Sequence, residues 1–127
     1  MSTYKYESIQ LVDASGEEFS FTQVNDLRIN IESGIIEVLR NNESFVLPFD
    51  RLRSFQVHFT TAQEAQAAYR SCEVTLTSLP KDAPNKLTLS EIINFDWKAD
   101  QGLFMLFAKN STLGVHLDHL ISFKTEK

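Results

Sequence analysis

The stretch DRLRSF at residues 50–55 returns 68 positions later as DHLISF at residues 118–123. Around it, residues 17–57 align with residues 85–125 without a gap, although only 6 positions are identical. Of the 17 apolar residues in the first segment, 15 meet an apolar residue in the second, whereas chance placement gives about 8. The sequence therefore predicts an internal duplication, with repeats at about 1–60 and 71–127 fused into a single domain, 1–127.

Both repeats carry the patterns of β-strands. Apolar residues alternate with polar ones in short runs that end at Gly, Asn or Asp, and residues 24–26 shift the phase as a β-bulge does. The expected strands are 4–12, 19–21, 27–31, 35–40, 44–49 and 52–59 in the first repeat, and 72–78, 86–98, 102–109, 112–117 and 119–125 in the second. We therefore expect a mainly β fold in which two antiparallel meanders form a pseudo-twofold sandwich or a flattened barrel.

One segment between the repeats has a different composition. Residues 61–70 are rich in Ala, Gln and Glu, and Glu64 stands three residues after Thr61, the spacing of a helix capping box. The sequence predicts one short connecting helix there.

Composition and charge narrow the class of protein. No stretch approaches the roughly 18 consecutive apolar residues of a membrane span. The formal charge of -5 disfavours binding to nucleic acid or to an anionic membrane surface. The first residues lack the apolar run of a secretory signal, and the single Cys72 cannot form an internal disulfide. We expect a cytoplasmic protein without a membrane span.

The residue types that perform catalysis or bind metal do not form a known motif. His116 and His119 have a spacing that suits a metal site on a helix, but on a strand their side chains point to opposite faces. Cys72 begins an alternating apolar strand, which is typical of a small buried residue. The sequence therefore predicts a protein that is not an enzyme and that holds no metal or cofactor.

Three apolar residues are the first candidates for a binding surface. The run LFMLF at 103–107 contains Phe104 and Met105, where the first repeat has Ile36 and Glu37. Such a run is typical of a central strand buried on both faces, or of an exposed patch that meets a partner or a second subunit. Trp97 is either a core residue or an interface anchor.

Two arginines form a second candidate site. Arg51 and Arg53 lie two apart on an expected strand, so their side chains would point the same way and could hold a carboxylate or phosphate. A solvated pair is the alternative.

These observations favour binding over catalysis. The leading hypothesis is a small acidic protein-binding module, an adaptor or inhibitor of the kind that mobile elements encode, whose partner is another protein or a second copy in a homodimer. The alternative is a carrier of a small ligand or lipid, with a cavity lined by some of the ten phenylalanines.

Overall fold

A computed structural model describes residues 5–30, 32–41, 43–60, 64, 66–77 and 86–127. These residues form eleven strands and three short 3-10 turns, and every strand pair is antiparallel. The elements are β1 (Tyr6–Asp13), β2 (Glu18–Val24), β3 (Asp26–Asn30), β4 (Ile35–Arg40), β5 (Glu43–Pro48), η1 (Phe49–Arg51), β6 (Leu52–Phe59), β7 (Tyr69–Leu76), β8 (Lys86–Lys98), η2 (Ala99–Gln101), β9 (Leu103–Ala108), β10 (Ser111–His116), η3 (Leu117–His119) and β11 (Leu120–Glu126).

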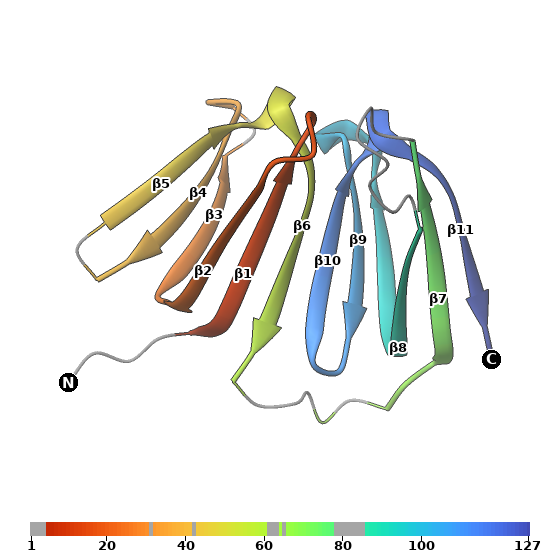
Figure 1. Ribbon diagram of the computed structural model, residues 1–127. Helices are drawn as coiled ribbons and strands as arrows, with labels where there is room; N and C mark the ends of the chain where they lie inside the picture. Colours follow the sequence, from red (N-terminus) through yellow and green to blue (C-terminus); the bar gives the residue numbers. More distant parts are fainter. Residues whose placement is uncertain (1–4, 31, 42, 61–63, 65, 78–85) are drawn as a thin grey trace.

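The strands form two sheets in a sandwich-like arrangement. One has eight strands in the order β11-β7-β8-β9-β10-β6-β1-β2, and the other has three in the order β3-β4-β5. Side chains of β4 and β5 pack against those of β1, β2 and β6 between the two sheets. In the view of Figure 1 the strands follow one another from β5 at one end to β11 at the other. The predicted mainly β class is confirmed.

The two repeats have matching elements. β4, β5, η1 and β6 each begin 68 residues before β9, β10, η3 and β11. The backbone repeats as well: Gln23 and Glu91 have φ values of 53° and 55°, and Gly34 and Gly102 both have a φ of 70°. The same hydrogen bond closes the two strand connections, from Phe49 N to Gly34 O at 2.7 Å and from Leu117 N to Gly102 O at 2.9 Å.

The repeats differ at one strand. β8 is a continuous strand of 13 residues that pairs with β7 through its first half and with β9 through its second. Its counterpart in the first repeat is divided into β2, which pairs with β1, and β3, which pairs with β4. The division falls at Asn25, inside the segment where the sequence predicts a bulge.

The repeats are joined through strands that are not counterparts. β6 ends the first repeat and pairs with β10, whereas the counterpart of β6 is β11 and the counterpart of β10 is β5. The repeats therefore follow one another head to tail, and the eight-stranded sheet continues from the second repeat through β10 and β6 into β1 and β2.

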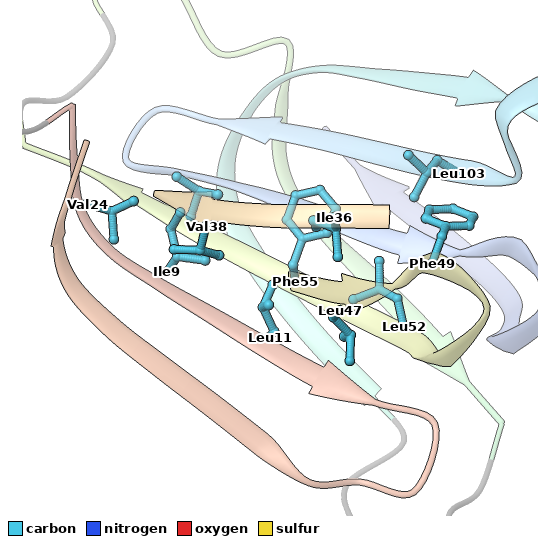
Figure 2. Close-up of a cluster of buried hydrophobic side chains, with 11 residues drawn as sticks. Ile9, Leu11, Val24, Ile36, Val38, Leu47, Phe49, Leu52, Phe55 and Leu103 are labelled. Carbon is cyan, nitrogen blue, oxygen red and sulfur yellow. The ribbon is translucent and has the colours of Figure 1, made fainter. Parts of the chain in front are cut away.

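The apolar residues form one core cluster in each repeat. The first contains Ile9, Leu11, Val24, Ile36, Val38, Leu47, Phe49, Leu52, Phe55, Val57 and Leu103. Figure 2 shows that Leu103, from β9, joins side chains that otherwise come from the first repeat. The second cluster contains Cys72, Val74, Leu76, Leu89, Ile92, Phe104, Leu106, Ala108, Leu113 and Val115.

The predicted connecting helix over 61–70 is wrong for the residues that the structure describes. Tyr69 and Arg70 belong to β7, Glu64, Gln66 and Ala67 have no regular structure, and residues 61–63 and 65 lie outside the described part. β6 and β7 lie four strand positions apart, about 19 Å at a strand spacing of about 4.8 Å. A ten-residue helix spans only about 15 Å, and a short Ala-rich helix gains little from packing.

The described part of the chain contains no helix with the length and hydrophobicity that a membrane crossing requires.

Candidate functional site

The junction between the repeats depends on one close contact across β6 and β10. Phe55 on β6 lies directly opposite Gly114 on β10. A Cβ atom added at Gly114 would lie 2.2 Å from Cε1 of the Phe55 ring, so no larger residue fits without movement. The junction therefore requires a glycine on one strand and an aromatic ring on the other.

β9 contributes to both cores. Phe104 and Leu106 are fully buried in the second cluster, while Leu103 and Met105 on the opposite face pack against the first. Strand β9 is thus a central strand that is covered on both faces, the first of the two interpretations of the 103–107 run. Phe104 is 0% exposed and Met105 is half-buried, because contacts within the two cores cover these two predicted binding residues.

Trp97 lies at the surface of the second repeat. Its side chain is 53% exposed, and its ring centroid lies 6.1 Å from that of Phe104 and 6.4 Å from that of Phe123. Phe104 and Phe123 in turn stack with their centroids 4.4 Å apart. Trp97 is therefore the exposed member of an aromatic cluster that also contains Phe104 and Phe123.

The structure separates the two arginines of the second predicted site. Arg51 ends the turn η1 and is exposed, whereas Arg53 lies on β6 and is 2% exposed. The two residues do not form a paired fork, because the 3-10 turn changes the direction of the chain before β6 begins.

Arg53 donates two hydrogen bonds to Thr77, the residue that directly follows β7. Its Nη1 donates to Thr77 Oγ1 at 3.3 Å, and its Nη2 donates to the Thr77 carbonyl. No carboxylate of the described residues forms an ion pair with it. Burial lowers the pKa of the Arg53 guanidinium from its usual value.

A pocket of about 140 Å³ adjoins Arg53. Gln10, Gln56 and Glu18 share its lining with apolar residues of both repeats. Glu18 and Arg53 both line this pocket, so it carries side chains of opposite charge.

The rings of His116 and His119 lie edge to face with their centroids 5.9 Å apart, because a 3-10 turn joins the two residues where the sequence predicted a strand. His116 is buried, its ring lies 4.7 Å from that of Phe49, and its Nδ1 accepts a hydrogen bond from the Asp118 N–H at 3.1 Å. His119 lies 3.4 Å from Thr77 Oγ1 through its Nδ1. Burial, with the charges of Arg53 and His116, lowers the pKa of His119. Among the residues that the structure describes, no group of three His, Cys, Asp or Glu could hold a metal.

Cys72 is fully buried in the second core cluster. Burial raises the pKa of its thiol, so the reactive thiolate is disfavoured.

Two of the exposed large apolar side chains lie on end strands of the sheets. Within the described residues the exposed large apolar side chains are Val46 on β5 at 45%, Trp97 on β8 at 53%, and Ile121 on β11 at 61%. β5 and β11 are each an end strand of their sheet, as are β3 and β2 at the opposite ends, and each lacks a strand partner on its outer side among the described residues. An exposed edge with apolar side chains is a template for another strand. Sequence reasoning missed Val46 and Ile121, because it did not show which strands would be outermost.

Comparisons with protein-family models, with curated proteins and with solved structures found no match for this chain.

Proposed function

We propose that this chain is a non-enzymatic, cytoplasmic protein-binding module that engages its partner through the outer edge of the second repeat. The observation that carries the proposal is the exposure of Ile121 on the open strand β11, together with that of Trp97 on β8, whose ring centroid lies 6.4 Å from that of Phe123 on β11. Tryptophan is enriched in the centres of protein interfaces, and an unpaired strand offers backbone hydrogen bonds to a partner strand. An adaptor or an inhibitor would use such a surface.

A variant of Ile121 tests this proposal more cleanly than a variant of Met105. Met105 contacts the first core across the junction, so its replacement by a charged residue would disturb the fold itself. Ile121 is 61% exposed and tolerates a charge without loss of packing. Ile121→Lys therefore separates binding from folding.

The experiment is a pull-down with the tagged protein, its Ile121→Lys variant and a Ser20→Lys control. Ser20 is an exposed residue of β2, the end strand opposite β11 in the eight-stranded sheet, and gives the same added charge on a different edge. We expect a stoichiometric partner that is retained by the wild type and the control and lost from Ile121→Lys. Equal capture by all three proteins would refute this location of the interface.

A second candidate function is supported by an apolar pocket between the repeats. Its volume is about 280 Å³, near the lower limit of small-molecule sites, and Tyr6, Phe55, Phe59, Met105 and Phe107 are part of its lining. A carrier of a small apolar ligand or lipid would use it. Native mass spectrometry of the purified protein tests this: a bound small molecule supports it, and Phe59→Trp should then reduce the bound fraction by filling the pocket.

A further inference from the structure

The counterparts of the two junction strands are end strands of the sheets. Inside the molecule, β6 of the first repeat pairs with β10 of the second. The counterpart of β6 is β11, and the counterpart of β10 is β5. These two counterparts lie at opposite ends of the view in Figure 1. One copy therefore has the counterpart of β6 at one end and the counterpart of β10 at the other, and β6 and β10 pair with each other inside the molecule.

The exposed apolar residues coincide with this arrangement. Val46, Trp97 and Ile121 each lie 68 positions from a residue that is less exposed: Gly114, Ile29 and Arg53. Gly114 is covered by Phe55, Ile29 packs against the first core, and Arg53 is 2% exposed. Each of these three positions is therefore buried or half-buried in one repeat and exposed in the other.

We propose that a second copy of this chain binds head to tail, with its β5 antiparallel to β11 of the first copy. This inference rests on the proposed function, since it names the partner of the same edge. The internal junction pairs Gly114 with Phe55 and Val115 with Ser54. The same register places Val46 of one copy opposite Phe123 of the other, and Leu47 opposite Ser122. It also brings Pro48 of one copy opposite Ile121 of the other, so two of the three exposed side chains are covered.

The contact between copies is weaker than the internal junction. Val46 takes the place of Gly114, and the Phe123 ring stacks on Phe104 where the Phe55 ring covers the glycine. Glu37 takes the place of Met105, with its carboxylate accepting a hydrogen bond from Ser44 at 2.9 Å. We therefore expect reversible association that depends on protein concentration.

Charges at one end of the register do not prevent pairing. Glu43 of one copy comes opposite Glu126 of the other, and like charges across strands are unfavourable. Glu43 already pairs with Arg40 and Glu126 with Arg70, both at 2.8 Å. Each local pair is therefore neutral when the strands meet.

A head-to-tail contact has a property that a twofold contact lacks. Because its two surfaces differ, a copy with one defective surface still carries one intact surface. Two variants with opposite defects should therefore bind each other although neither associates with itself. Pairing of β11 with β11 across a twofold axis gives no such complementation.

The experiment measures mass by light scattering and sedimentation over a range of concentrations. The proteins are the wild type, Val46→Lys, Ile121→Lys, a 1:1 mixture of these two variants, and the Ser20→Lys control. We expect the wild type and the control to gain mass with concentration, each end variant to stay monomeric, and the mixture to form a species of two chains. Val46→Thr and Ile121→Thr repeat the test with milder changes if a lysine variant fails to fold.

A wild type that stays monomeric at every concentration overturns the inference. Association that survives Val46→Lys and is lost only in Ile121→Lys also overturns it, in favour of a twofold dimer. A monomeric wild type that still captures another protein, with that protein lost in Ile121→Lys, would overturn the self-association and support the protein-binding function.

Discussion

The Phe55 ring covers the α-carbon of Gly114 so closely that a Cβ atom there would lie 2.2 Å from the ring. The two residues belong to different repeats and meet where β6 pairs with β10. In the first repeat the position of Gly114 is taken by Val46, on an outer strand where no ring covers it. The same position of the repeat is therefore constrained in one copy and free in the other.

Gly114→Ala should destabilise the protein by about 1–3 kcal/mol, because overpacking forces the ring or the strand to move. Urea unfolding gives the free energy of unfolding. Val46→Ala is the matched control at the counterpart position, and we expect a change within about 0.5 kcal/mol. Combining Gly114→Ala with Phe55→Leu should cost less than the two single changes together. Full additivity would show that the ring is not the source of the strain.

Arg53→Ala should lower the free energy of unfolding by about 2–3 kcal/mol, because it leaves a cavity and removes the donors that satisfy Thr77. Arg51→Ala removes the same charge from an exposed residue, and its effect should stay within about 0.5 kcal/mol. Thermal and urea unfolding measure both. Equal effects of the two substitutions would contradict the separation of the arginines.

The stability of the protein should fall in mild acid because of His119. Its pKa is lower in the folded state than the ordinary value of 6.5, so the unfolded chain binds the proton more readily. The free energy of unfolding should therefore decrease as the pH falls below about 6.5. Above that pH the stabilising contribution of the neutral His119 is fully present.

The measurement is urea unfolding at a series of pH values, with His119→Gln beside the wild type. His119→Gln should reduce the slope between about pH 5 and about pH 7. An unchanged slope in His119→Gln would exclude this histidine as the source.

Cys72 should resist thiol reagents in the folded protein, because it is fully buried and its thiol pKa is raised. Labelling followed by mass spectrometry should show no rapid adduct in buffer and complete modification in concentrated urea. Rapid modification of the folded protein would mean that the second core opens readily.

The sequence by itself determined the repeat and most of its strands. The 68-residue offset predicted strands at 35–40, 52–59 and 86–98 that match β4, β6 and β8 residue for residue. Alternation of apolar residues succeeds for β4 because that strand buries every second residue of its first half, so the local sequence carries the pattern. The break between β2 and β3 was likewise visible in the shift of phase at 24–26.

Only the tertiary structure decided how the repeats join and what each residue therefore does. The choice of β10 as the partner of β6 rests on contacts between residues more than 50 positions apart, such as Phe55 with Gly114. That choice buries Arg53, covers β9 on both faces and leaves Val46, Trp97 and Ile121 exposed. Counterpart residues have similar local patterns, so their exposure depends on neighbours that the local pattern does not encode. The same holds for the described residues 64, 66 and 67 of the connecting segment, which have no regular structure although their composition favours a helix.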